Sequence, residues 1–282
     1  MKLICIAILL FLAAGMISAQ PRALFTPEDE ALFDRYLSFI EPYKEQPVES
    51  VLEKTATYFL GKPYAAHTLE VTEDETLVVN LRAFDCTTFV ETVIALAHTA
   101  KLEKPSFNLF VDELRKIRYR SGMVHGYASR LHYTTDWIFE NERQDRLVNI
   151  SASLGGEKEL KKIHFISSHR DAYKQVHSDD NVLNEIISKE NEINERDGFY
   201  YLPKTAIASN ESRIPHMAMI AFTTTIKGLD VTHMGFSFHK KGRLTFIHAS
   251  STENRVVIDG KSLRDYCEGQ SRCTGIMVVK IL

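Results

Sequence analysis

The sequence predicts an α+β protein, with helices in its N-terminal half and an antiparallel β-sheet in its C-terminal half. Apolar residues from Phe89 to Ala97 recur at the spacing of a helical face. After residue 217 the pattern changes to short alternating segments, which turns at Gly228 and Gly242 separate. Because no stretch rich in Gly, Ser or Pro divides the chain, we expect a single domain over residues 20–282.

Three more helices and a strand are expected in the first half of the chain. Thr26 and Pro27 are typical of a helix start, and apolar residues follow them up to Ile40. A second helix is expected over residues 49–60, where Gly61 ends it. The remaining elements are a short strand over residues 77–81 and a helix over residues 107–119.

The helix that begins near Cys86 places a thiol where it can react. Asp85 can cap this helix, because its carboxylate accepts hydrogen bonds from N–H groups of the first turn. Alternatively, Thr88 and Glu91 form a capping box, which leaves Cys86 just outside the helix. Free N–H groups and the dipole at a helix start favour a thiolate. Cys86 is therefore a candidate nucleophile, and a buried, inert cysteine is the alternative.

Residues 121–137 are rich in tyrosine and histidine and contain the single tryptophan, Trp137. The segment has no clear helical or strand periodicity, so we expect a loop. Aromatic faces and a fixed carboxylate suit a polyhydroxylated ring, and the loop could therefore line a sugar-binding cleft. The alternative is an aromatic plug that covers the core.

The C-terminal half is expected to hold an antiparallel meander. A strand over residues 161–167 and a charged, solvent-facing helix over residues 181–195 come first. Strands then follow at residues 219–225, 232–239, 244–251 and 275–281. Because a short turn joins the second and third of these, we expect them to lie side by side.

Residues 1–19 have the pattern of a secretory signal peptide. Lys2 precedes an apolar run that ends in the small residues Ser18 and Ala19. Cys5 lies inside the apolar run and not at the cleavage point, so we expect no lipid-modified cysteine. No later stretch is apolar enough to cross a bilayer. We therefore expect an exported protein, periplasmic or secreted, with no stable membrane insertion.

Charge and cysteine content exclude some functions and predict one bridge. The formal net charge is -3, and cleavage after residue 19 makes it more negative, so nothing attracts the protein to nucleic acid. Three cysteines remain, and an odd number in an exported chain suggests one pair and one free thiol. Cys267 and Cys273 flank a turn at Gly269 and are expected to be disulfide-bonded, which leaves Cys86 free.

Two histidines on neighbouring strands can complete a site with Cys86. His233 and His248 lie on strands that are expected to pair, so cross-strand contact can bring them together. A cysteine nucleophile needs a base, and the base needs a partner that fixes its tautomer. A zinc site that also uses His239 is a weaker alternative, because no short ligand motif supports it. We expect no metal and no cofactor.

The candidate site lies in three segments: Phe84-Asp85-Cys86-Thr87-Thr88-Phe89-Val90, Thr232-His233-Met234-Gly235-Phe236 and Phe246-Ile247-His248-Ala249-Ser250. They resemble the signature segments of the NlpC/P60 superfamily of papain-like cell-wall hydrolases. Gly61-Lys62-Pro63-Tyr64, the run from Leu69 to Leu81 and the segment from Ser129 to Trp137 resemble the DUF1460 branch more narrowly. The resemblance spans most of the chain after residue 19. One departure is Thr87, where many superfamily members carry serine.

The resemblance implies a papain-like fold in which Cys86 is the nucleophile, His233 the base and His248 the residue that orients it. The DUF1460 branch is associated with N-acetylmuramoyl-L-alanine amidase activity on anhydro-muropeptides. The expected substrate is therefore a muropeptide, cut between the muramic acid and L-alanine. The expected protein is a monomer.

Substrate-binding residues are expected on two sides of this site. By resemblance, Tyr64 and Asp85 line the pocket near the peptide. Arg130, Asp136 and Trp137 are candidates for the sugar side. Two other functions fit the same residues. A γ-D-glutamyl-diaminopimelate endopeptidase of the superfamily would use the same three catalytic groups, and a non-catalytic muropeptide-binding protein would keep the cleft without a reactive thiol.

Overall fold

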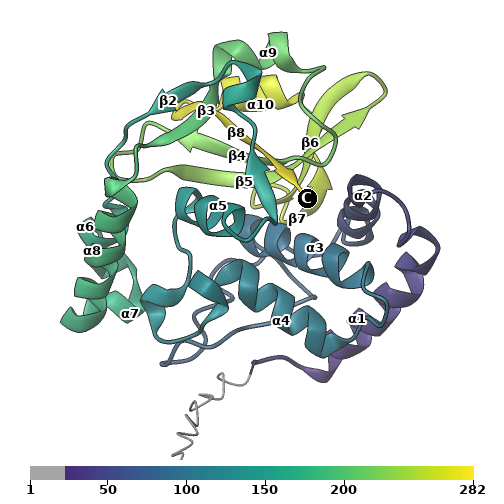
Figure 1. Cartoon of the computed structure of the whole chain (residues 1–282), viewed down its shortest axis with the longest axis horizontal. Coiled ribbons are helices and arrows are strands. Elements are labelled where there is room, and N and C mark those ends of the chain that lie inside the picture. Colours follow the sequence, from purple (N-terminus) through teal and green to yellow (C-terminus); the bar gives the residue numbers. More distant parts are fainter. Residues whose placement is uncertain (1–22) are drawn as a thin grey trace, which may run out of the picture.

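The computed structural model describes residues 23–282, and the expected signal peptide lies outside the described residues. Figure 1 shows the arrangement of the elements. The helices are α1 (Pro27–Ile40), α2 (Val48–Tyr58), α3 (Cys86–Ala100), α4 (Phe107–Arg118), α5 (Thr134–Glu142), α6 (Phe165–Ser168), α7 (Lys174–His177), α8 (Asp180–Glu195), α9 (Ile207–Asn210) and α10 (Leu263–Gly269). The strands are β1 (Leu147–Asn149), β2 (Glu157–Glu159), β3 (Phe199–Pro203), β4 (Met219–Thr224), β5 (Val231–Lys240), β6 (Arg243–Ser250), β7 (Arg255–Ile258) and β8 (Cys273–Ile281).

One antiparallel sheet organises the molecule. Its strand order is β2-β3-β8-β4-β5-β6-β7, and β1 also pairs with β8. Helices α1 to α5 lie on one side of the sheet, and α9 and α10 lie on the other (Figure 1). The predicted α+β class is therefore confirmed, with the helical layer supplied by the N-terminal half of the chain.

Strand β4 is buried along its whole length because both faces of the sheet are covered. Met219 and Ala221 point into the core that the sheet shares with the N-terminal helices. Ile220 and Phe222 point into the second core, under α10. This double burial explains why the segment is continuously apolar rather than alternating.

Helix α3 runs through the middle of the larger core. It is buried on nearly every side, and not only on the face that the sequence predicts. Asp85 caps it, as predicted, by accepting a hydrogen bond from the Thr88 N–H at 2.8 Å. The alternative capping box is wrong, because Glu91 is buried and pairs with Arg118 at 2.7 Å.

Most predicted helices and strands are confirmed, and two predicted strands are wrong. Residues 77–81 form an extended segment whose pairing in the described chain is one bridge between Leu24 and Val78. Residues 161–167 make one bridge, from Ile163 to Gly228, and then turn into α6. In both segments the apolar residues pack against a core cluster and do not pair along a β-ladder.

The segment expected as an aromatic loop, residues 121–137, ends in the first turn of α5. The helix was not predicted because its small hydrophobic side is split between the core and a surface hollow. Strands β1, β2, β3 and β7 and helix α10 were also missed, since each is too short for its periodicity to stand out.

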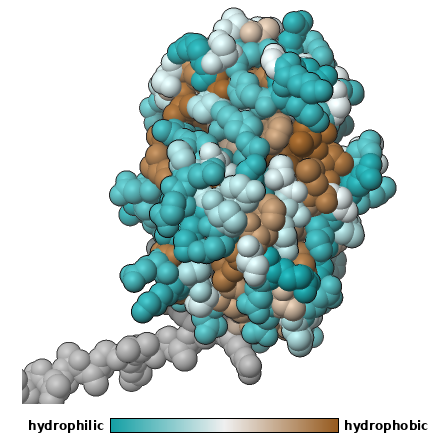
Figure 2. All heavy atoms as spheres, turned by 90° about the vertical axis from the view of Figure 1, so that its right-hand side faces the viewer, coloured by the Kyte–Doolittle hydropathy of each residue, from teal (hydrophilic) through white to brown (hydrophobic). Residues whose placement is uncertain are grey.

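The remaining features of the fold concern the length of its helices and the polarity of its surface. Within residues 23–282, every helix is too short or too polar to cross a bilayer. On the face drawn in Figure 2, hydrophobic atoms form separate patches between hydrophilic ones.

Candidate active site

The start of α3 holds Cys86 in a fixed position. The Asp85 carboxylate accepts hydrogen bonds from the N–H and the hydroxyl of Thr88, both at 2.8 Å. The Thr88 hydroxyl in turn accepts from the Asp85 N–H at 3.0 Å. Cys86 is the first helical residue, so its own N–H lies outside the hydrogen-bond ladder of the helix. The side chain is partly exposed.

The sulfur of Cys86 lies beside strand β5. It accepts hydrogen bonds from the backbone N–H groups of Met234 and Thr87, and the Thr87 hydroxyl lies 4.0 Å away. Burial and the charge of Asp85 nevertheless raise the pKa of the thiol to about 11. The expected shift toward thiolate at the helix start is therefore wrong for the resting site, because desolvation outweighs the N–H donors.

His233 and His248 lie side by side, as their strands predict. His233 Nε2 and His248 Nδ1 are 2.6 Å apart, and the two rings are nearly perpendicular at 86°. Burial lowers the pKa of His233 to about 3 and that of His248 to about 4. The resting site therefore contains a neutral thiol and two neutral imidazoles.

Gly235 allows this close approach of the two strands. The β5–β6 register pairs Phe236 with Ile247, which puts Gly235 opposite His248. A Cβ atom on Gly235 would lie 2.6 Å from the Ile247 carbonyl oxygen and 2.9 Å from the His248 Cβ. Any side chain there would push the strands apart, so the glycine is part of the geometry of the histidine pair.

Asp259 extends the histidine pair by one residue. Its Oδ2 lies 3.3 Å from His248 Nε2, on the far side of that ring from His233. Sequence analysis missed Asp259. The available signal was an Asp-Gly turn directly after β7, the strand that pairs with the one carrying His248.

Tyr64 and Asp85, the two residues expected on the peptide side, lie close to Cys86. A bridge joins Tyr64 to Phe84, and the Tyr64 N–H donates to the Asn254 carbonyl at 2.9 Å. Burial raises the pKa of Tyr64, and its neighbours Cys86 and Asp85 add to the shift. The tyrosine is therefore placed to contact a group bound at the thiol.

The three residues expected on the sugar side lie inside the protein. Trp137 is 2% exposed and belongs to the larger core. Asp136 is also 2% exposed and pairs with Arg120 and Arg196 at 2.5 and 2.8 Å. Arg130 is 7% exposed and lies over the Tyr127 ring. This packing favours an aromatic plug over a sugar-lining surface.

A polar cavity of about 660 Å³ opens beside the histidines. His233, His248 and Asp259 form part of its wall, together with residues of the β6–β7 turn and α10. Tyr266 of α10 packs on both imidazoles, with ring centroids 6.1 and 5.9 Å from them. The cavity is large enough for a sugar or a short peptide.

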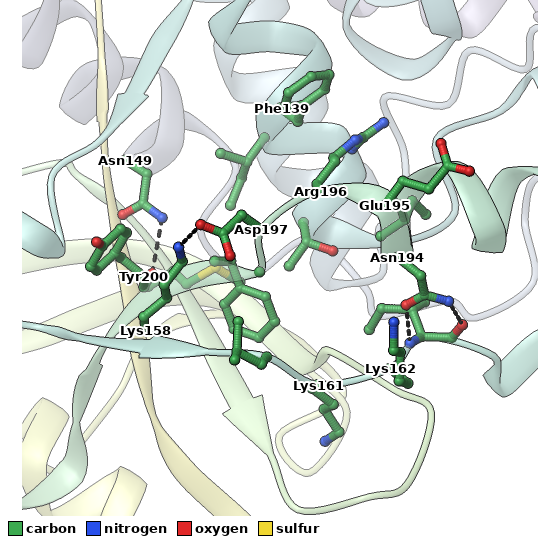
Figure 3. Close-up of a pocket in the computed structure, with 18 of the residues that line it drawn as sticks. Phe139, Asn149, Lys158, Lys161, Lys162, Asn194, Glu195, Arg196, Asp197 and Tyr200 are labelled. Carbon is green, nitrogen blue, oxygen red and sulfur yellow. Dashed lines mark hydrogen bonds and ion pairs between the residues drawn. The ribbon is translucent and has the colours of Figure 1, made fainter.

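A second hollow, of about 710 Å³, lies between α5, β2 and the end of α8 (Figure 3). Figure 3 shows Lys158 paired with Asp197, and Asn149 bonded to the backbone carbonyl of Tyr200. Its lining contains no cysteine or histidine among the described residues, so it offers no nucleophile and base of the kind found beside Cys86.

Cys267 and Cys273 are free thiols in the structure, and the predicted disulfide is absent. Both are buried, their side chains are hydrogen-bonded to each other, and the Cys273 thiol also donates to the Gly275 carbonyl at 3.4 Å. The two cysteines lie together, as the sequence predicts. Whether they form a disulfide or stay as two thiols depends on oxidation and not on proximity, so the sequence cannot decide it.

A family model described as AmiA-like, N-acetylmuramoyl-L-alanine amidase-like, matches residues 54–276. The match contains the Cys86, His233 and His248 segments and covers most of the chain. The protein belongs to this family. As a member of the AmiA-like family, it has a cell-wall amidase-like role at the family level.

Solved structures agree with this family membership. An N-acetylmuramoyl-L-alanine amidase from Bacteroides uniformis is 36% identical, with a TM-score of 0.78, over 82% of this chain and 98% of that one. A protein from Bacteroides fragilis, provisionally named a xylanase, is 34% identical, with a TM-score of 0.77, over 80% and 99%.

A more distant structure shows the fold alone. A Legionella pneumophila protein of the DUF1460 family model is 22% identical, with a TM-score of 0.68, over 90% of this chain and 95% of that one. No curated protein matches the AmiA-like chain.

Proposed function

We propose that the protein is a cysteine-dependent N-acetylmuramoyl-L-alanine amidase with a papain-like, NlpC/P60-type site. In this proposal Cys86 is the nucleophile, His233 is the base and His248 orients it. The observation that carries it is the arrangement of a thiol at the start of α3 beside the strand that bears His233, with His248 bonded to His233 at 2.6 Å. Similarity to the Bacteroides uniformis amidases supports the choice of the amide between muramic acid and L-alanine as the bond that is cleaved.

The reaction has two stages, and in each of them His233 takes up one proton and then releases it. As the Cys86 sulfur attacks the lactyl carbonyl carbon, the thiol proton passes to His233, and the carbonyl oxygen gains the charge that the Cys86 N–H can bind. Collapse breaks the C–N bond, and His233 returns the proton to the departing L-alanine amine. Water activated by His233 then breaks the C–S bond and restores the thiol. No metal or cofactor enters these steps.

The substrate in this proposal is a soluble muropeptide that keeps its sugar, with 1,6-anhydro-muramic acid preferred. The polar cavity that His233 and His248 line is the space that we assign to groups flanking the amide. We also propose that the protein is exported, after cleavage at residue 19, and that it acts as a monomer in the periplasm or outside the cell.

Mass spectrometry of the products from defined muropeptides tests the function. The wild-type protein should release free peptide with an N-terminal L-alanine from anhydro-muramoyl peptides, and Cys86→Ala should release none. His233→Ala should lose nearly as much activity, and His248→Ala less, since orienting a base contributes less than being one. Cys267→Ala, which removes a thiol outside the site, is the matched control.

Other products would replace the proposal with one of its alternatives. Cleavage of sugar-free L-Ala-γ-D-Glu peptides to release diaminopimelyl peptides would identify an endopeptidase. Tight binding without turnover would identify a muropeptide-binding protein. Hydrolysis of xylan would favour a glycosidase, but such an enzyme needs two carboxyl groups flanking the bond, and Asp259 beside His248 is already bonded to His248 and Lys261.

A further inference from the structure

The carboxylate of Asp259 is held so that one oxygen faces His248. The Asp259 N–H donates to the Phe246 carbonyl at 2.9 Å, and the Asp259 carbonyl accepts from the Thr245 hydroxyl at 2.9 Å. Its Oδ1 accepts from the Lys261 N–H at 2.7 Å. With these groups occupied, Oδ2 is the oxygen that lies 3.3 Å from His248 Nε2.

This geometry assigns the protons on both imidazole rings. An ionised carboxylate only accepts hydrogen bonds, so His248 Nε2 carries a proton. A neutral imidazole has one N–H, and His248 Nδ1 must therefore accept the bond from His233 Nε2 across 2.6 Å. His233 is left with its lone pair on Nδ1. In this tautomer Nδ1 is the ring nitrogen that can accept a proton, which in the proposed function comes from Cys86.

We propose that Asp259 is a positioning residue that keeps His233 in the tautomer able to accept the Cys86 proton. The proposal rests on the proposed function and adds a fourth group behind the three already named. Asp259 acts through His248 and not on the substrate. Its charge also favours the protonated form of His233 during the reaction, since it opposes the effect of burial on that ring.

The substitution Asp259→Asn should reverse both tautomers. The Lys261 N–H should keep the amide oxygen at the Oδ1 position, which turns the NH₂ group toward His248 Nε2. His248 Nε2 must then accept, its Nδ1–H donates to His233, and His233 carries its proton on Nδ1. In this form His233 cannot act as a base toward the thiol.

Two measurements on the full chain test this. Nitrogen-15 NMR of the imidazoles should show His233 protonated on Nε2 in the wild type and on Nδ1 in Asp259→Asn. With muropeptide as substrate, kcat should fall roughly 100-fold or more while KM changes little, by analogy with the ~10⁴-fold loss for the equivalent change in serine proteases. Asp259→Glu, which keeps an acceptor, should recover part of the activity.

Asp265→Asn is the matched control, because this carboxylate lies on α10 and is exposed. It should change neither readout. An unchanged His233 tautomer in folded Asp259→Asn protein would overturn the proposal, whatever its activity. A wild-type protein that cleaves no muropeptide would contradict the proposed function alone, because the tautomer measurement does not depend on turnover.

Discussion

The thiol of Cys86 is held as a neutral acid in the resting protein. Burial and Asp85 raise its pKa to about 11, and burial lowers the pKa of His233 to about 3. A thiolate–imidazolium pair would need the opposite order of the two values. The site therefore differs from a cysteine protease with a permanently ionised pair. In the proposed reaction the proton has to move as the substrate amide binds beside the sulfur.

Alkylation of Cys86 should reveal this state. Because only the thiolate reacts, the rate with iodoacetamide at Cys86 should rise about tenfold per pH unit between pH 7 and pH 9. Peptide mapping by mass spectrometry separates this reaction from any at Cys267 or Cys273. A rate that is already at its plateau at pH 6 would contradict the prediction and indicate a stable ion pair with His233.

The positions of the candidate site residues could be predicted from sequence, and their electrostatics could not. Cys86, His233 and His248 follow from a helix start and two paired strands, which are local patterns. The thiol pKa depends instead on how far residues distant in sequence exclude water from the sulfur. Asp259 was missed for a related reason, since its role depends on a hydrogen bond to a different strand.

At the scale of elements, the β5–β6 pair determines where the histidines lie. Gly235→Ala should destabilise the protein by about 1–3 kcal/mol, because the new Cβ would meet backbone and His248 at less than 3.0 Å. It should also lower activity, since the strands must separate beside the histidine pair. Denaturant unfolding and turnover measure the two effects.

Gly269→Ala is the matched control for this substitution. A Cβ at Gly269 would meet no atom closer than the Lys261 Nζ at 3.9 Å. Its effect on stability and turnover should therefore be small. Equal stability and activity in the two alanine variants would show that the strands can relax around a side chain at position 235.

Helices α3 and α4 are joined by a buried ion pair. Arg118 Nε lies 2.7 Å from a Glu91 carboxylate oxygen, and its Nη1 donates to the Val78 carbonyl at 2.6 Å. Arg118→Met would leave the Glu91 carboxylate buried and unpaired, so we expect a loss of about 3–5 kcal/mol in the free energy of unfolding. Urea denaturation of the variant measures it.

Removing both charges should cost less than removing one. The double variant Arg118→Met/Glu91→Leu should recover much of the lost stability, because no unpaired charge remains. Lys44→Met, which removes the half-buried partner of the exposed Glu41, should change stability little. A double variant as unstable as Arg118→Met would show that the arginine stabilises α3 by its packing and not by its charge.

Elements with a long periodic pattern were predicted correctly, and elements defined by tertiary contact were not. Helix α4 repeats its buried residues at the helical spacing over 12 residues, and strands β5 and β6 are 10 and 8 residues long. The extended segment 77–81 is also apolar, but its pairing within the described residues is one bridge from Leu24 to Val78, and it lies against α1 and the Arg118 side chain. A pattern of burial alone does not say whether a partner strand is present.

At the scale of the whole molecule, buried histidines make stability depend on pH. Burial lowers the pKa of His132 to about 3, that of His233 to about 3 and that of His248 to about 4. A histidine in an unfolded chain has a pKa near ~6.5. At a pH between these values and ~6.5 the unfolded state binds more protons than the folded state. The stability contributed by each neutral histidine is therefore fully present above pH ~6.5 and is lost as the pH falls toward the folded-state pKa.

His132 allows this effect to be measured away from the candidate active site. Its Nε2 donates to the Tyr127 carbonyl at 2.8 Å, a bond that the amide of His132→Gln can keep without taking up a proton. Carboxyl groups whose pKa burial raises, such as those of Glu91 and Asp230, act in the opposite sense, so variants must be compared with the wild type at each pH.

Urea unfolding between pH 7 and pH 4.5 should show the wild type losing up to ~1.4 kcal/mol per pH unit more than His132→Gln at the acid end. His67→Gln, at a side chain that is 85% exposed, should follow the wild type. Parallel pH dependence of His132→Gln and the wild type would mean that His132 is already protonated in the folded protein.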